Sequence, residues 1–358
     1  MIKTNKLFTV TVAVLMSFAL YANAAEQTNF QPESGGYHLE LPANRIEIYR
    51  TTKGIRYMVG TQLINTDIYP LPNFLAVPMK NYSEQQISDF ENFISEIEDY
   101  TGFTLEKSSL VQETKNVGSK FTPKLVLNEK GYAFTLQPPA NSNITRDFII
   151  GKAYQLSNDR LLVVRVSAPK KDKTLAQNTL SVLTHNLKIS KPKYVDNNII
   201  KAKNLNYEIT LPSGWHAFTM LADNIIMAKS LSSVHNDEAM IRSFKTKSFA
   251  SLANADAKTM ATEESEFVEK ITKFTPNVKV IKHEPIVANG INGVIIESTE
   301  LVNLKKIFVV NAYFFAKDDS AYQIKFKTDD TINSDIKINA FKNAVKSFQK
   351  TNYINVSN

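Results

Sequence analysis

Alternating hydrophobic and polar residues recur in two segments whose first residues are 160 positions apart. The first segment, FIIGKAYQLSNDRLLVVRV, covers residues 148–166, and the second, FVVNAYFFAKDDSAYQIKF, covers residues 308–326. Each contains an apolar run with an Ala-Tyr pair, a polar turn, and a second alternating run. This pattern predicts a β-hairpin in each half of the chain and indicates an internal repeat.

The segments around the two hairpins repeat in the same order. A strand opened by glycine precedes each hairpin, GYAFTLQ at Gly131 and GVIIEST at Gly293. An amphipathic helix is predicted after each hairpin, because apolar residues recur there at helical spacing. These residues are Leu180, Leu183 and Leu187 in the first half and Phe341, Val345 and Phe348 in the second.

A further helix is predicted in the middle of each half. Residues 82–102 open with a capping box formed by Ser83 and Gln86 and then place apolar residues on one face. Residues 254–276 repeat this spacing and stop at Pro276. Each half is therefore predicted to be α+β, an antiparallel sheet packed with two main helices, because short polar turns rather than helical crossovers join the strands.

The repeat also predicts the domain boundaries. A chain of 358 residues is longer than one hydrophobic core usually fills. We expect a first domain over 34–190, a linker over 191–204, and a second domain over 205–350. The linker is predicted from its lysine and asparagine content, from Pro192, and from its weak periodicity.

The first 24 residues have the pattern of a secretory signal peptide. Lys3 and Lys6 precede an apolar run over 7–20, and the small-residue motif Ala22-Asn23-Ala24 follows it. Cleavage after Ala24 is favoured over a retained anchor. No later segment approaches 18 uninterrupted apolar residues, so no integral membrane span is expected after cleavage. The expected location is the periplasm or the extracellular medium.

Composition and charge exclude several classes of function. The chain has no cysteine, which excludes disulfides, thiolate metal sites, a thiol nucleophile and a lipid-anchored N-terminal cysteine. The formal net charge of +7 comes from dispersed lysines without interleaved aromatic residues. This distribution predicts a solvated surface and not a nucleic-acid interface.

The segment NYEITLPSGW covers residues 206–215. Strands, a long helix, a glycine-led strand, a hairpin and a helix ending in NAVKSF follow it in that order. This segment and the order of elements after it resemble the Mog1/PsbP-like fold. The resemblance covers most of 206–349, whereas the first half is more diverged and has LPANRIEIY in place of the Gly-Trp motif. It implies two tandem Mog1/PsbP-like domains in an exported bacterial protein. It also implies a binding or accessory role, since protein binding is what members of that superfamily share, but it names no partner, ligand or cofactor.

Candidate site residues are few. His235, Asp237 and Glu238 belong to the only dense run of metal-capable side chains, and they are weak cation candidates because no paired-histidine spacing accompanies them. A polar loop is the favoured interpretation of this run. Four aromatic residues are candidates for the core or for partner binding, with the core favoured for the tryptophan. They are Trp215, Tyr313, Phe314 and Phe315.

Catalytic motifs are not found. The sequence has no G-x-S-x-G, P-loop or G-x-G-x-x-G motif, and Pro169 interrupts the S-x-x-K match at 167–170. The predicted function is therefore a non-enzymatic, exported protein-binding or accessory protein of the bacterial envelope or secretome. It would act through its paired domain surfaces on another envelope or secreted protein, without a cofactor. The alternative is a small-ligand or metal-binding carrier, or a hydrolase, with a site between the domains.

Overall fold

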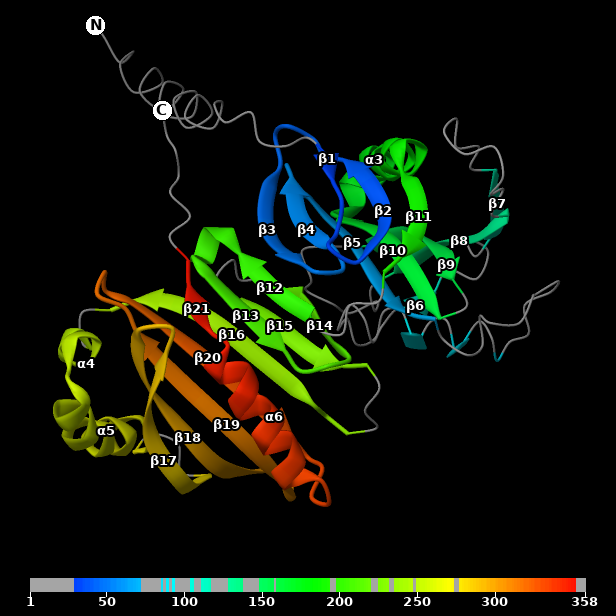
Figure 1. Ribbon diagram of the computed structural model, residues 1–358. Helices are drawn as coiled ribbons and strands as arrows, with labels where there is room; N and C mark the ends of the chain where they lie inside the picture. The colour runs from blue at the N-terminus through cyan, green and yellow to red at the C-terminus, as the bar shows by residue number, and fades with distance from the viewer. Residues whose placement is uncertain are drawn as a thin grey trace, which may run out of the picture.

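The computed structural model is a sheet-rich α+β structure with few helices (Figure 1). It describes residues 29–71, 85, 88–89, 92–93, 104–105, 111–116, 128–137, 148–157, 159–193, 198–219, 225–231, 235–246, 249–273 and 277–351. Among these residues, no helix is both long enough and apolar enough to cross a membrane. The predicted signal peptide, most of the predicted helix over 82–102, and residues 194–197 of the predicted linker lie outside the described residues.

Strands of the first half form a small sheet and most of a large one. The small sheet has the order β1-β2-β11, and the first-half strands of the large sheet have the order β3-β4-β5-β10-β9-β8-β6, with β7 also on β8. These strands are β1 (Asn29–Phe30), β2 (Gly35–Glu40), β3 (Ile46–Thr51), β4 (Ile55–Val59), β5 (Gln62–Pro70), β6 (Thr104–Leu105), β7 (Val111–Asn116), β8 (Asn128–Gln137), β9 (Phe148–Ser157), β10 (Arg160–Ala168) and β11 (Lys188–Pro192). After the short 3-10 helix η3 (Lys170–Asp172), helix α3 (Lys173–Asn186) packs Leu180 and Leu183 into the core of this half.

The second half has a sheet of its own with the order β14-β15-β16-β20-β19-β18-β17. Helix α6 (Ser334–Lys346) packs on one face, and α4 (Ala250–Asn254) and α5 (Ala257–Thr272) pack on the other. The strands are β14 (Trp215–Thr219), β15 (Ile225–Ser230), β16 (Glu238–Lys245), β17 (Val278–Ala288), β18 (Ile291–Val302), β19 (Lys305–Phe315) and β20 (Ser320–Thr328). The Asp256 carboxylate caps α5 by accepting a hydrogen bond from the Thr259 N–H at 2.7 Å.

The predicted hairpins and three of the predicted helices are confirmed. β9 pairs antiparallel with β10, and β19 with β20, at the predicted positions. Helices α3, α5 and α6 lie where the apolar spacing placed them. Phe348 differs, because α6 ends at Lys346, but its ring is still fully buried and stacks on Phe314 at 4.6 Å.

The two halves share the large sheet. β12 (Asn198–Ala202), β13 (Tyr207–Leu211) and β21 (Gln349–Lys350) extend it beyond β3, and the 3-10 helix η4 (Lys203–Leu205) connects β12 to β13. β12 pairs antiparallel with β3, so that Ile200 lies opposite Thr51. Residues 198–202, expected in a linker, are thus a strand. Their alternation buries Asn198, Ile200 and Ala202 while the residues between them remain partly exposed.

Side chains strengthen this joint between the halves. The Tyr49 hydroxyl donates a hydrogen bond to the carbonyl oxygen of Ala217 at 2.8 Å. The fully buried Asn198 donates from Nδ2 to the carbonyl oxygen of Trp215 at 3.0 Å and accepts from the Thr52 hydroxyl at 3.2 Å. These hydrogen bonds at the joint are therefore buried and directional.

A buried histidine also lies at the joint. The His216 ring stacks on the Tyr69 ring with a centroid distance of 4.8 Å, and its side chain is almost fully enclosed. Neither ring nitrogen has a hydrogen-bond partner among the described residues. Burial is the main cause that holds the pKa of His216 well below its ordinary value of 6.5, and three nearby cations add to the effect. These cations are Lys53, Arg160 and Arg165.

We predict that His216→Phe makes the protein less sensitive to acid. Below pH 6.5 the unfolded chain binds a proton at His216 that the folded chain excludes, so wild-type stability falls as the pH falls. Phenylalanine keeps the ring stack on Tyr69 and removes this proton. Urea unfolding between about pH 4.5 and 7.5 should give a free energy that falls less steeply in the variant, by up to about 1.4 kcal/mol per pH unit.

Asp67 serves as an internal reference in this comparison. Burial raises the pKa of Asp67 to about 6, although the charge of Lys53 opposes this shift. As the pH falls, the folded protein therefore binds a proton at Asp67 before the unfolded chain does. This uptake raises the free energy of unfolding, which is opposite to the effect of His216. Asp67 is present in both proteins and cancels from their difference. Parallel pH profiles for wild type and variant would show that His216 is protonated in the folded state.

Candidate functional site

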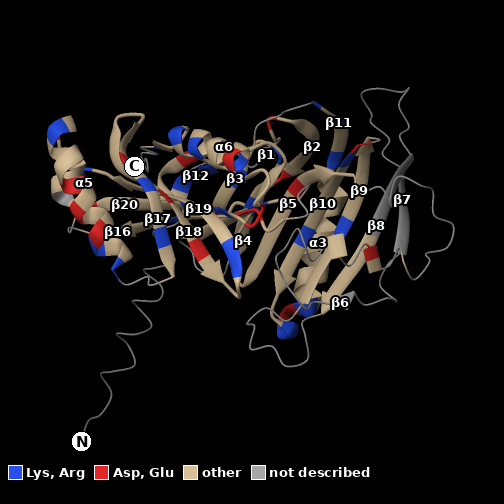
Figure 2. Cartoon of the chain, turned by 90° about the horizontal axis from the view of Figure 1, so that it is seen from below, with Lys and Arg blue, Asp and Glu red and all other residues tan. Residues whose placement is uncertain are grey.

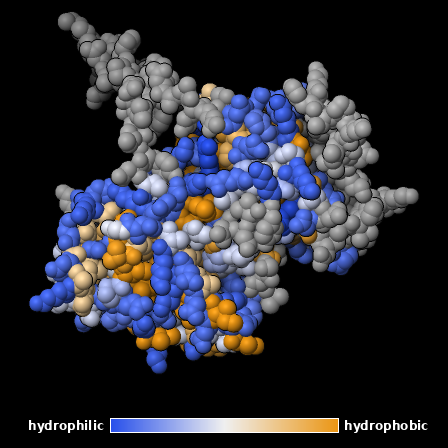
Figure 3. All heavy atoms as spheres, in the orientation of Figure 1, coloured by the Kyte–Doolittle hydropathy of each residue, from blue (hydrophilic) through white to orange (hydrophobic). Residues whose placement is uncertain are grey.

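Exposed apolar side chains concentrate in the second half. Of the large hydrophobic residues that are exposed among those described, seven belong to the second half and three to the first. The second-half group comprises Ile281, Val287, Leu301, Val302, Leu304, Ile332 and Ile336, and the first-half group comprises Ile46, Leu175 and Val182. Figure 3 shows hydrophobic patches along the lower edge of this half. Basic and acidic residues, in contrast, are interspersed along both halves (Figure 2).

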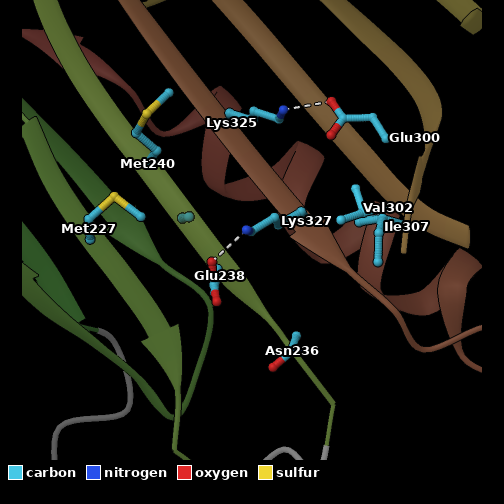
Figure 4. Close-up of a pocket in the computed structure, with 10 residues that line it drawn as sticks. Met227, Asn236, Glu238, Met240, Glu300, Val302, Ile307, Lys325 and Lys327 are labelled. Carbon is cyan, nitrogen blue, oxygen red and sulfur yellow. Dashed lines mark hydrogen bonds and ion pairs between the residues drawn. The ribbon is translucent and has the colours of Figure 1, made fainter. Parts of the chain in front are cut away.

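A groove with a volume of about 330 Å³ lies on the sheet of the second half, on the face opposite α6. Strands β15, β16 and β20 and the ends of β18 and β19 supply its walls (Figure 4). Its apolar side chains are Met227, Met240, Val302 and Ile307, and its polar ones are Asn236, Glu238, Glu300, Lys325 and Lys327. We call it the methionine groove.

Strand pairing brings the two methionines together. Met227 on β15 lies directly opposite Met240 on β16, which in turn lies opposite Lys325 on β20. Because successive strand residues point to opposite faces, the neighbours Ala228 and Ala239 point the other way, into the core under α6. The methionines therefore form a row across the open face of the sheet.

Two ion pairs neutralise the sides of the groove. Lys325 Nζ lies 2.6 Å from Glu300 Oε1, and Lys327 Nζ lies 2.7 Å from Glu238 Oε2 (Figure 4). Each pair is partly exposed, with side-chain exposures between 19% and 41%. The groove thus has an apolar floor between charged side chains that are already paired with each other. Such a groove suits an apolar ligand surface better than a charged one.

The groove is open because the second helical layer covers only part of this face. Phe267 of α5 packs on Phe315 and Tyr313 of β19, at ring distances of 5.3 and 5.2 Å. The rest of that cluster involves β17 and β18, and it includes no residue of β15, β16 or β20. The side chains on this face of β15, β16 and β20, including the two methionines, therefore lie beyond the area on which α4 and α5 pack.

The structure separates Glu238 from the other two cation candidates, whereas His235 and Asp237 border one cluster. His235 Nε2 lies 3.6 Å from Asp330 Oδ2, and Asp237 is joined to the same Asp330 through Lys337. Asp237 Oδ1 and Oδ2 lie 3.0 and 2.8 Å from Lys337 Nζ, which also lies 3.0 Å from Asp330 Oδ2. His235 Nδ1 lies 3.3 Å from Asp329 Oδ1. Glu238, next in the strand, points into the methionine groove. An ammonium group therefore sits where a cation beside Asp237 would bind, and no group of three or more metal-capable side chains is found in the part of the chain that the structure describes.

Electrostatics support this lysine-centred arrangement. Hydrogen bonds from the backbone and side chain of Asn333, together with Lys337, hold the pKa of Asp330 well below its usual value. Partial burial works to lower the pKa of Lys337, but hydrogen bonds to Asp237 and Asp330 raise it above its usual value. Asp330 and Lys337 are therefore charged near neutral pH, and Lys337 joins the start of α6 to Asp237 in the segment before β16.

Three of the four candidate aromatic residues are buried in the core, and the fourth, Tyr313, is partly buried. Trp215 is 4% exposed and makes edge contacts with Phe326 and Phe341 at 5.5 and 5.6 Å. Phe314 faces α6, whereas Tyr313 and Phe315 face α5, as alternation along a strand requires. Trp215, Phe314 and Phe315 are thus enclosed by core side chains, whereas Tyr313 is only partly buried under α5.

Met227 and Met240 were not identified from the sequence. A signal was present, because each methionine takes a position on a mostly polar face, which also carries Lys229, Glu238, Arg242 and the apolar Ile225. An apolar, flexible side chain on such a face is a feature of adaptable binding surfaces. Its meaning depended on knowing that none of the described helices packs on that part of the face.

Comparison with known proteins gives limited information. No protein-family model matches the sequence, and a search of curated proteins gives no match. Among solved structures, cyanobacterial PsbP from Synechocystis is similar at 12% identity over 41% of this chain and 88% of its own, with a TM-score of 0.32. The immunity protein TplEi of the T6SS from Pseudomonas aeruginosa is similar at 8% identity over 90% of this chain and 97% of its own, with a TM-score of 0.26. The Tle4-Tli4 complex contains a chain similar at 7% identity over 92% of this chain and all of its own, with a TM-score of 0.27. PsbP bears the fold name predicted from the sequence, but scores at this level decide neither family nor function.

Proposed function

We propose that the protein is a non-enzymatic binding protein whose methionine groove receives an apolar segment of another exported protein. The observation that carries this proposal is that Met227 and Met240 lie opposite each other on neighbouring strands of an open sheet face. The lysines and glutamates beside them form ion pairs with each other, so their charges are already neutralised. Methionine side chains are flexible and polarizable, so they adapt to the shape of an apolar partner. A volume of about 330 Å³ accommodates a few side chains of such a segment.

We further propose that the chain consists of two tandem Mog1/PsbP-like domains in an exported bacterial protein, periplasmic or secreted. Support comes from the order of pairing, since β8-β9-β10 is followed by α3 and β11 just as β18-β19-β20 is followed by α6 and β21. In each half the last strand returns to pair with an early one, β11 with β2 and β21 with β13. The signal-peptide pattern over 1–24 supports export.

Binding is favoured over catalysis by the chemistry of the groove. Its lining residues include no serine, threonine, histidine or cysteine, and its two lysines are each ion-paired with a glutamate, so neither amine is placed as a free nucleophile. Glu238 and Glu300 are each held by a lysine and are not arranged as an acid and base pair. The alternative, a ligand site between the domains, requires an open cleft, whereas the central contacts of Tyr49 and Asn198 between the halves are buried.

We predict that Met227→Glu combined with Met240→Glu lowers partner capture by at least about tenfold, because each carboxylate would have to be desolvated against an apolar partner. Both side chains are partly exposed, so the fold should tolerate the change. The measurement is photo-crosslinking in envelope and secreted fractions, followed by affinity of the purified partner for each variant.

The matched control is Leu175→Glu combined with Val182→Glu, which adds the same two charges at exposed positions on α3 in the first half. It should bind like wild type. Equal capture by the double variant and wild type would contradict the groove as the binding site. A thermal shift with a metabolite or metal in place of any protein partner would favour the carrier alternative.

A further inference from the structure

The hairpin between β18 and β19 ends in an exposed apolar tip. Leu304 is 92% exposed, and Leu301 and Val302 are 55% and 48% exposed. We call these three residues the apolar tip. Leu301 and Val302 pair with Lys306 and Lys305 across the hairpin, so the tip is the last part of a regular two-stranded ladder.

The backbone of the tip does not favour leucine. Asn303 and Leu304 have φ values of 50° and 65°, so both central residues of this two-residue turn are left-handed. Such turns prefer asparagine followed by glycine, because a side chain at the second position strains the left-handed backbone. Leu304 is thus unfavourable for the turn and is also exposed to water. Neither feature helps the fold, which indicates a role outside it.

Two basic residues flank the apolar tip. Lys305 and Lys306 are both exposed, and Lys306 Nζ lies 4.7 Å from the centre of the Phe308 ring. Neither lysine forms an ion pair with a carboxylate of a described residue. The nearest acidic residue in the ladder, Glu300, is held by Lys325. The end of the hairpin is therefore apolar and positively charged.

We propose that this hairpin end docks on a membrane surface that contains anionic phospholipids. The apolar tip would enter the boundary between headgroups and acyl chains, while Lys305 and Lys306 contact phosphate groups. Charge complementarity favours anionic lipid over a protein partner, since the tip has two lysines that pair with no carboxylate of a described residue and only three exposed apolar side chains, fewer residues than a protein interface of standard size needs. The apolar tip adjoins the methionine groove, since Val302 belongs to both, but the inference rests on Leu304 and the two lysines and does not depend on the proposed function.

The test is co-sedimentation with vesicles, using the protein in the N-terminal form that its cells produce, as fixed by mass spectrometry. One vesicle preparation contains equal parts of phosphatidylcholine and phosphatidylglycerol, and the other contains phosphatidylcholine alone. Wild type should bind the anionic vesicles more tightly, and added salt should weaken this binding.

Leu304→Gly separates docking from folding. Glycine fits the left-handed turn, so the urea midpoint should not fall, whereas partition to anionic vesicles should drop about tenfold. Replacing both tip lysines, Lys305→Gln with Lys306→Gln, should remove the preference for anionic vesicles. Leu175→Ser, which removes an exposed leucine from α3, is the matched control and should bind like wild type.

Three results would overturn the proposal. They are no vesicle binding by wild type, undiminished binding by Leu304→Gly, and an equal loss of binding in Leu175→Ser. Capture of a protein by the apolar tip, with vesicle binding unaffected by Leu304→Gly, would assign the tip to a protein interface instead.

Discussion

Trp215→Ala is expected to lower the free energy of unfolding by about 3–5 kcal/mol. Trp215 fills the space between β20 and α6, with edge contacts to Phe326 and Phe341. Those two phenylalanine rings also stack on one another at 5.0 Å, so removal of the indole leaves a cavity bordered by both. The rings can collapse into it only by losing contacts elsewhere in the same core.

Trp215→Phe is the matched control, since it keeps an aromatic ring and leaves a smaller cavity. Its loss should be clearly smaller than that of the alanine variant. Urea unfolding should be followed by circular dichroism, because Trp215 is the only tryptophan and its replacement removes the fluorescence signal. A loss below about 1 kcal/mol for Trp215→Ala would mean that the core under α6 does not depend on this ring.

Asn198→Leu is expected to lower the free energy of unfolding by about 2–4 kcal/mol and to loosen the joint between the halves. Leucine has a similar size but removes the donor to the Trp215 carbonyl and the acceptor for the Thr52 hydroxyl. Both groups are buried, so water cannot replace the lost contacts without opening the joint. Weaker coupling should appear in calorimetry as two transitions in place of one.

Asn204→Ala provides a graded comparison. Asn204 also crosses between the halves, donating from Nδ2 to the carbonyl oxygen of Glu47 at 2.6 Å, but the contact is only partly buried. Its loss should therefore cost less, about 1 kcal/mol, and leave a single transition. The assignment of Asn198 as the central joint residue would be wrong if both variants unfolded alike.

Local patterns predicted the hairpins and the helices α3, α5 and α6, because periods of two and 3.6 residues are set by neighbours in the chain. The joint was not predictable in this way. β12 pairs with β3, which lies about 150 residues earlier in the chain. This pairing depends on strand edges that come together only when both halves are folded. Apolar and polar residues do alternate along β12 and bury Ile200, but the strand has only five residues. A pattern of that length could not be distinguished from the sequence of a linker.

The candidate site was harder to predict for a related reason. His235, Asp237 and Glu238 are close in sequence, yet Glu238 points into the groove while His235 and Asp237 border the cluster of Asp330 and Lys337, where the lysine occupies the place of a cation. Met227 and Met240 lie on the consecutive strands β15 and β16 and meet through antiparallel pairing, whose register the sequence did not reveal. Their exposure depends on where α5 ends, which is a property of the assembled layers.

The sheet shared by β3 and β12 means that the peptide bonds between β11 and β12 are not what keeps the halves together. A cut in that connection would leave β12 hydrogen-bonded to β3, with Tyr49 still joined to Ala217 and Asn198 to Thr52. The two fragments would therefore remain a noncovalent pair, and the chain could be made as two separate polypeptides that find each other through these edges.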